Sequence, residues 1–133
     1  MRRRRSGQSL VEFALALPVI FILILGIIEG GRLVFSLTTL DFAVQEGGRL
    51  AALPGTASVS AVQSHVTNNA HFITVPSGAV AVTVNNGAKV YTSRTSGDRV
   101  VVTANYTYSP IVTSVFGLNL NMTLSARSDM RAE

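Results

Sequence analysis

The sequence predicts an α+β fold in which one long N-terminal helix packs on a small, mainly antiparallel sheet of 3–4 strands. Residues 8–53 show no strand-like alternation and predict a single helix, whereas several segments after residue 78 alternate with a period of two. We expect a leader at residues 1–7, the helix at residues 8–53 and a small α+β domain at residues 54–133.

The first half of the predicted helix is apolar enough to cross a membrane. From Leu10 to Ile28 the only charged residue is Glu12. At about 1.5 Å per residue this run spans roughly 28 Å, close to the hydrocarbon core of about 30 Å. The run is preceded by four arginines, Arg2, Arg3, Arg4 and Arg5. Because such clusters stay on the cytoplasmic side, we expect one span at about residues 10–28 in the lipid bilayer of the cytoplasmic (inner) membrane, with the C-terminal domain outside.

The positive net charge of the chain comes from its N-terminus. Eleven Lys and Arg face seven Asp and Glu, which makes the formal net charge +4. Because four of the eleven are the leading arginines, seven basic and seven acidic side chains remain beyond residue 7. The body has no basic patch with interleaved aromatic residues, so no nucleic-acid partner is expected. The chain contains no cysteine, which excludes disulfides and thiolate chemistry.

Three interpretations of residues 1–28 remain open. A cleaved secretory signal explains the arginines, but the apolar run exceeds the usual length of about 7–15 residues. An uncleaved anchor explains the arginines and the length of the run, but neither Gly7 nor Glu12. A processing point after Gly7, with a glutamate five residues beyond it, accounts for all of these features.

Several stretches of the chain resemble known motifs. The stretch GQSLVEF at residues 7–13 resembles the prepilin peptidase site. In that site, cleavage follows Gly, and Glu is the fifth residue of the mature protein. Further stretches resemble the TadE-like pseudopilin family of tight-adherence (Flp-type) pili, a type IV pilin-like family. These stretches are SLVEFALALP at residues 9–18, GIIEGGR at 26–32, QEGGRLAA at 45–52 and TLSARSDMR at 123–131. Phe13 fits the aromatic residue that follows the glutamate in this branch, whereas Gly30 stands where the family often has an aromatic residue.

The resemblance implies a pilin-like subunit or minor pseudopilin that a prepilin peptidase cuts between Gly7 and Gln8. Such a subunit is assembled into, or primes, a tight-adherence pilus, and thus can become extracellular. The implied partners are other pilin or pseudopilin subunits, an assembly ATPase and an inner-membrane assembly platform. Whether the chain is an abundant filament subunit or a rare initiator stays open.

Glu12, followed by Phe13, is the expected assembly and register residue. A carboxylate at the bilayer centre costs roughly 2.5–3.5 kcal/mol on insertion scales. Cleavage after Gly7 creates a new amine at Gln8, and Glu12 of one subunit can neutralise that amine in the next. The alternative function is an unprocessed, membrane-anchored, β-rich binding or adhesion module.

The second half of the predicted helix carries a narrow apolar stripe. Alternating steps of four and three connect its members, Leu33, Leu37, Leu40, Val44, Gly47 and Ala51. This stripe is expected to pack on the protein's own sheet or, alternatively, against other helices of a filament. Pairs three residues apart, Glu29 with Arg32 and Glu46 with Arg49, indicate surface ion pairs.

The remaining elements follow from short patterns. Ser58 is the expected N-cap of a second helix that ends at Asn69, and Asn86-Gly87 predicts a tight hairpin turn. Strands are expected at residues 78–85, 89–92, 99–108 and 118–127.

We expect no enzyme, no cofactor and no metal site. His65 and His71 are six residues apart and fall on different faces of a helix. The remaining acids are scattered singly along the chain, at Asp41, Asp98, Asp129 and Glu133.

Overall fold

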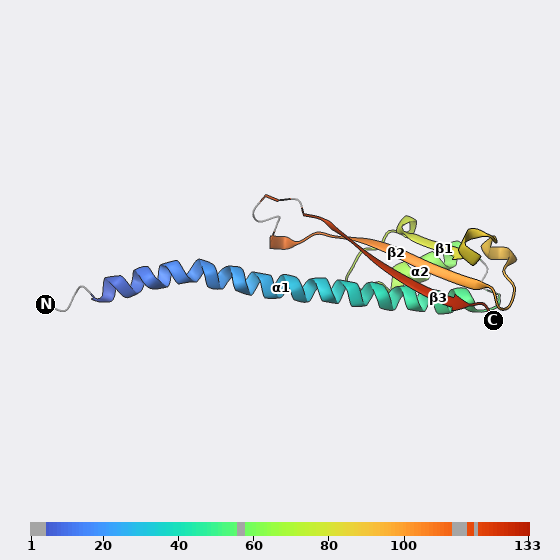
Figure 1. The fold of residues 1–133 in the computed structure, drawn as a ribbon, viewed down its shortest axis with the longest axis horizontal. Helices are drawn as coiled ribbons and strands as arrows, with labels where there is room; N and C mark the ends of the chain where they lie inside the picture. The colour runs from blue at the N-terminus through green and yellow to red at the C-terminus, as the bar shows by residue number, and fades with distance from the viewer. Residues whose placement is uncertain (1–4, 56–57, 113–116, 119) are drawn as a thin grey trace.

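The computed structural model describes residues 5–55, 58–112, 117–118 and 120–133. Arg2, Arg3 and Arg4, together with the side chain of Arg5, lie outside this description. The main elements are α1 (Arg5–Ala52), α2 (Val59–Asn69), β1 (Val80–Val84), β2 (Arg99–Tyr108) and β3 (Met122–Arg131). Figure 1 shows that α1 runs the whole length of the molecule, and that α2 and the sheet cover only its C-terminal half. The α+β prediction is therefore confirmed.

Helix α1 continues without interruption through Pro18, which is the proline inside its apolar half. The helix is long and apolar enough to cross a membrane, and its most apolar window is not buried by the rest of the chain. Helix α2 begins as predicted, because the side chain of Ser58 accepts a hydrogen bond from Ala61 N at 3.2 Å. This cap satisfies one of the amides that a helix leaves unpaired in its first turn.

The sheet has three antiparallel strands in the order β1-β2-β3. Strand β2 has the predicted bounds, whereas β1 is shorter than residues 78–85. The predicted last strand is present, but its bounds are shifted from residues 118–127 to residues 122–131, where β3 lies. Register explains the difference, since Met122 pairs with Tyr108 at the last residue of β2. Beyond Tyr108, β2 offers no backbone partner to Leu118 or Leu120.

The predicted strand at residues 89–92 is wrong. A 3₁₀ turn, η2 (Asn85–Gly87), follows β1, and only one isolated bridge joins Val84 to Lys89. The backbone has positive φ at Asn85, Asn86 and Gly87, with values of 48°, 57° and 88°. Because this turn redirects the chain, a second 3₁₀ turn, η3 (Tyr91–Ser93), takes the place of a fourth strand.

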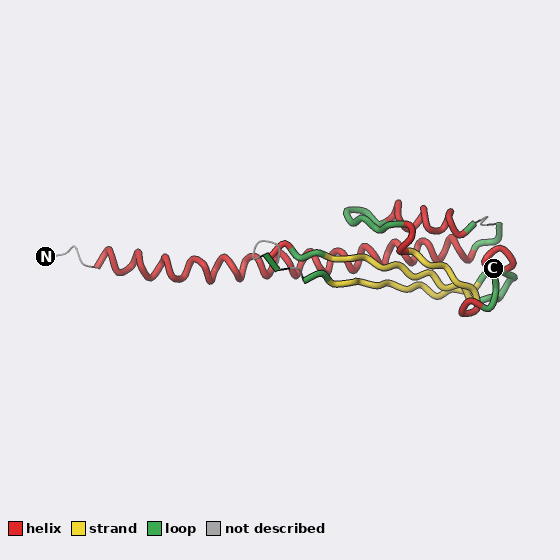
Figure 2. Tube along the Cα trace, turned by 90° about the horizontal axis from the view of Figure 1, so that it is seen from above, coloured by secondary structure: helices red, strands yellow, loops and turns green. Residues whose placement is uncertain are grey.

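The core lies between α1, α2 and one face of the sheet. Strands β2 and β3 contact α1, while β1 contacts α2, so the two helices share the cover of the sheet. In Figure 2 the strands and α2 run along the same half of α1. The fully buried side chains at this junction include Leu40, Val44, Val62, Val66 and Val102.

Two glycines allow α1 to approach its neighbours closely. A Cβ on Gly47 would collide with the side chain of Val66 in α2. A Cβ on Gly48 would lie 2.9 Å from Cβ of Ser128 in β3 and closer still to its hydroxyl. Since real Cβ atoms do not pack at such distances, the pair sets how near α2 and β3 lie to the axis of α1.

Candidate functional site

The residues predicted to act in processing and assembly share the first turns of α1. Gly7, Gln8, Glu12 and Phe13 are all exposed, and Phe13 keeps 62% of its surface accessible. The Gln8 side-chain amide donates a hydrogen bond from Nε2 to Oε1 of Glu12 at 3.3 Å, one helical turn further on. The sequence position that would carry the new amine therefore already lies beside the carboxylate.

A continuous apolar surface follows this acidic turn. Apart from Leu25, which is partly buried, its large members are each at least half exposed: Leu10, Val11, Phe13, Leu15, Leu17, Val19, Ile20, Phe21, Ile22, Leu23, Ile24, Ile27 and Ile28. Monomeric soluble proteins rarely expose apolar patches larger than a few hundred Å². This half of α1 therefore needs lipid or other helices around it.

The apolar stripe of the second half is only partly covered by the chain's own domain. Leu40 and Val44 are fully buried, Leu33 is half-buried, and Leu37 keeps 38% of its surface exposed. The buried surface of α1 also includes small residues that are not members of the apolar stripe: Ser36, Ala43 and Gly48. Small side chains that recur next to an apolar stripe are the signal that can reveal such a close packing face.

Glu29, at the end of the apolar run, is a tertiary anchor as well as the partner of Arg32. Its carboxylate accepts a hydrogen bond from the Tyr108 hydroxyl, and Oε2 accepts a second from Ile111 N at 3.0 Å. Arg32 Nη1 lies 3.2 Å from Oε1. Sequence reasoning found only the Arg32 pair, because Tyr108 and Ile111 are 79 and 82 positions away in the chain.

These contacts hold Glu29 in its charged form. The Tyr108 hydroxyl, Ile111 N and Arg32 together lower the pKa of Glu29, against the opposing effect of burial. Burial and the adjacent carboxylate raise the pKa of Tyr108 to about 12, so the phenol stays a hydrogen-bond donor. The end of β2 is thereby tied to α1 through a charge-assisted bond.

The C-terminal end of α1 is held by a second group of contacts. The Tyr91 hydroxyl donates to the Ala51 carbonyl at 3.2 Å, and Glu133 N donates to the Ala52 carbonyl at 3.0 Å. Arg94 Nη2 donates to the Leu53 carbonyl at 2.8 Å. The last carbonyls of a helix lack partners within the helix, so these three donors from the domain satisfy them.

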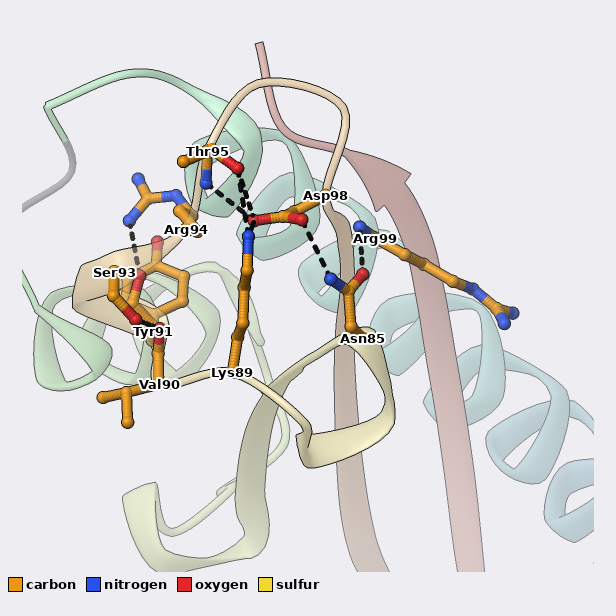
Figure 3. Close-up of polar contacts among 9 residues, drawn as sticks. All are labelled: Asn85, Lys89, Val90, Tyr91, Ser93, Arg94, Thr95, Asp98 and Arg99. Carbon is orange, nitrogen blue, oxygen red and sulfur yellow. Dashed lines mark hydrogen bonds and ion pairs between the residues drawn. The ribbon is translucent and has the colours of Figure 1, made fainter.

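A polar cluster around Asp98 shapes the same end of the molecule (Figure 3). Asp98 accepts hydrogen bonds from Lys89 Nζ at 2.7 Å, Thr95 N at 2.7 Å and Asn85 Nδ2 at 2.9 Å. These donors, Lys89 first, hold the pKa of Asp98 well below its usual range. Because its own chain supplies the donors, the carboxylate orders the loop between β1 and β2.

Two of the remaining acids form ion pairs with basic side chains that the sequence did not predict. Asp98 binds Lys89 as described, and Asp129 of β3 accepts a hydrogen bond from Arg99 Nε of β2 at 2.8 Å. His65 is half-buried in α2, and His71 is exposed just after it. Among the residues that the structure describes, no three His, Cys, Asp or Glu side chains gather as a metal site.

Comparison with known proteins finds a family match for most of the first helix. Residues 7–49 match the family model described as TadE-like protein. Over this segment the chain is TadE-like. The TadE-like match includes Gly7, Glu12 and Glu29 and ends within α1, before the sheet begins. No curated protein and no solved structure matches the chain. The likeness to TadE-like proteins over this segment suggests a pilin-like protein associated with tight-adherence pili.

Proposed function

We propose that this TadE-like protein is a pilin-like subunit or minor pseudopilin, processed after Gly7 and assembled into, or priming, a tight-adherence pilus. One observation carries the proposal above all. The TadE-like segment begins with an apolar run, residues 10–28, whose large side chains are mostly exposed and whose only acid, Glu12, lies one turn from the processing position. A helix of this kind suits lipid before assembly and neighbouring helices after it.

Processing by a prepilin peptidase is favoured by the position of Gly7 in the first turn of α1. The first amides of a helix have no partner within the helix, and Gly costs about 1 kcal/mol relative to Ala in a helix. The turn around Gly7 is therefore the easiest part of α1 to unwind for cleavage. Removal of residues 1–7 takes away four arginines and leaves seven basic and seven acidic side chains.

Glu12 then sets the register between subunits. Its carboxylate is exposed on α1, so it is accessible to the Gln8 amine of an adjacent subunit. Pairing with that amine offsets the cost of a charge among apolar helices, because each charge gains a partner as water is lost. Phe13, on the neighbouring face, supplies apolar contact area beside the ion pair.

The partners follow from this arrangement. Before assembly the subunit crosses the inner membrane once, with Arg2–Arg5 inside and the α+β domain outside. The peptidase and an inner-membrane assembly platform act on it there. In a filament, the partly exposed stripe residue Leu37 and the apolar half of α1 would pack against other pilin or pseudopilin subunits.

The N-terminal mass of the protein, recovered from membranes of its native host, tests the proposal. We expect a start at Gln8, which Gly7→Leu or loss of the peptidase abolishes. Gly31→Leu is the matched control, since Gly31 is also an exposed glycine of α1, and it should leave the start at Gln8. A wild-type start at Met1 would contradict processing and favour the unprocessed binding or adhesion module.

A further inference from the structure

The connection between β2 and β3 lies beside the point where the apolar run of α1 ends. Ile111 N donates to Glu29 Oε2 at 3.0 Å, and Glu29 directly follows Ile28, the last residue of that run. In Figure 1, β2 and β3 extend back along α1 to this level, far from its C-terminal end. If residues 10–28 cross the bilayer, this connection is the part of the domain nearest to the lipid.

Four large apolar side chains in the connection and at the start of β3 are exposed, beside the polar Ser109 and Asn121. The accessible fractions are 47% for Ile111, 55% for Leu118, 58% for Leu120 and 43% for Met122. The sequence contains no Asp, Glu, Lys or Arg between Arg99 and Arg127. A charge-free group of large apolar side chains is disfavoured in water and favoured at the boundary of acyl chains and headgroups.

A cation lies at the same level of the helix. Arg32 contacts Glu29, and 43% of its side chain remains exposed. A long cationic side chain beside an apolar surface places its stem along the acyl region and its charge among anionic headgroups. Apolar side chains next to a basic residue at the end of a membrane span fit a lipid surface better than a soluble partner.

We propose that Ile111, Leu118, Leu120 and Met122 form a lipid-contacting surface that rests in the outer-leaflet interface of the bilayer. This inference rests on the proposed function in one respect, the membrane crossing of residues 10–28. The Glu29–Ile111 bond holds the surface at a constant height beside α1. The domain therefore meets the membrane at two places, through α1 and through this surface, and its orientation on the bilayer is set before assembly.

The chain contains no tryptophan, so one introduced indole reports on one position. The full chain, carrying Leu118→Trp or Leu120→Trp, is reconstituted in phosphatidylcholine–phosphatidylglycerol vesicles. Tryptophan emission is then compared between ordinary lipids and lipids brominated in the upper part of the acyl chain. Ile24→Trp reports on the membrane span, and Val90→Trp is the control for an exposed position remote from the lipid, since Val90 is 70% exposed.

We expect brominated lipid to quench Leu118→Trp, Leu120→Trp and Ile24→Trp, and to leave Val90→Trp bright. If Ile24→Trp is quenched while both connection variants stay as bright as Val90→Trp, the lipid surface is refuted and the membrane span stands. If neither Ile24→Trp nor the connection variants are quenched, the lipid surface, the membrane crossing and the proposed function are all refuted. Blue-shifted emission without bromine quenching, growing with protein density, would assign the surface to a neighbouring subunit and overturn the lipid proposal.

Discussion

The hydroxyl of Tyr108, the last residue of β2, donates a hydrogen bond to the carboxylate of Glu29, 79 positions earlier in α1. This bond fastens the sheet to the helix at the end of the apolar run. At the opposite end, Tyr91 bonds the Ala51 carbonyl of α1, and Arg94 bonds the carbonyl of Leu53, just past the helix. The domain is therefore bonded to the second half of α1 at both ends of their contact.

Tyr108→Phe should lower the free energy of unfolding by about 1.5–3 kcal/mol, the usual contribution of a hydrogen bond to a charged group. Urea unfolding of the full chain in detergent micelles measures this loss. Tyr106→Phe is the matched control on the same strand, because its hydroxyl has no hydrogen-bond partner among the described residues. Equal stability of Tyr108→Phe and Tyr106→Phe would show that the Glu29 bond does not anchor the sheet.

Gly48→Ala should destabilise the protein by about 1–3 kcal/mol, the cost of forcing extra atoms into a packed interior. The new methyl group would push against Ser128 and separate β3 from α1. Gly31→Ala is the control on the same helix, since nothing lies within 4 Å of the added Cβ. That change should instead stabilise the helix by up to about 1 kcal/mol. Thermal unfolding of both variants measures the change in melting temperature relative to the wild type. If the two variants changed the melting temperature in the same direction, the packing argument would be refuted.

Asp98 should make the protein sensitive to acid. Its pKa is lowered in the folded state, mainly by Lys89, so between the folded and unfolded pKa values the unfolded chain binds more protons. Its contribution is complete above the unfolded pKa, near pH 4, and is lost as the pH falls further. Unfolding midpoints measured from pH 7 downward should therefore fall less steeply for Asp98→Asn than for the wild type. Parallel pH profiles would contradict this role.

Glu12→Leu should be inserted and cleaved normally but fail to assemble, because the Gln8 amine of the next subunit would lose its partner. The N-terminal mass reports cleavage, and crosslinking of subunits in host membranes reports assembly. Glu12→Asp keeps the charge with a shorter reach and should retain part of the assembly. Normal assembly of Glu12→Leu would remove the register role.

Much of the helical architecture could be predicted from local pattern alone. The uninterrupted apolar run predicted the first half of α1, Ser58 predicted the start of α2, and the alternation of residues 99–108 predicted β2. Each of these signals lies within a few residues of the element that it specifies. The same is true of Gly7 and Glu12, whose spacing along one helix needs no tertiary contact.

The start of β3 and the fate of residues 89–92 could not be predicted in this way. Alternation around Leu118 and Leu120 resembles a strand, yet pairing begins at Met122, because β2 ends opposite it at Tyr108. The positive φ angles of the η2 turn and the attraction of Lys89 to Asp98 remove the fourth strand. At β3, pairing with a distant strand overrides local propensity, and at residues 89–92 the turn and the ion pair to the next loop do so.

The sequence alone determined that this protein has a long helix with an apolar first half, a cluster of arginines at its N-terminus and one acid near the start of the apolar run. Those features depend on composition and on spacing along a single helix. Only the tertiary structure decided that Glu29 anchors Tyr108 and Ile111, that Gly47 and Gly48 admit α2 and β3, and that the β2–β3 connection lies beside the end of the apolar run. Such pairings depend on strand register and on close approach between residues far apart in the chain, which no local pattern encodes.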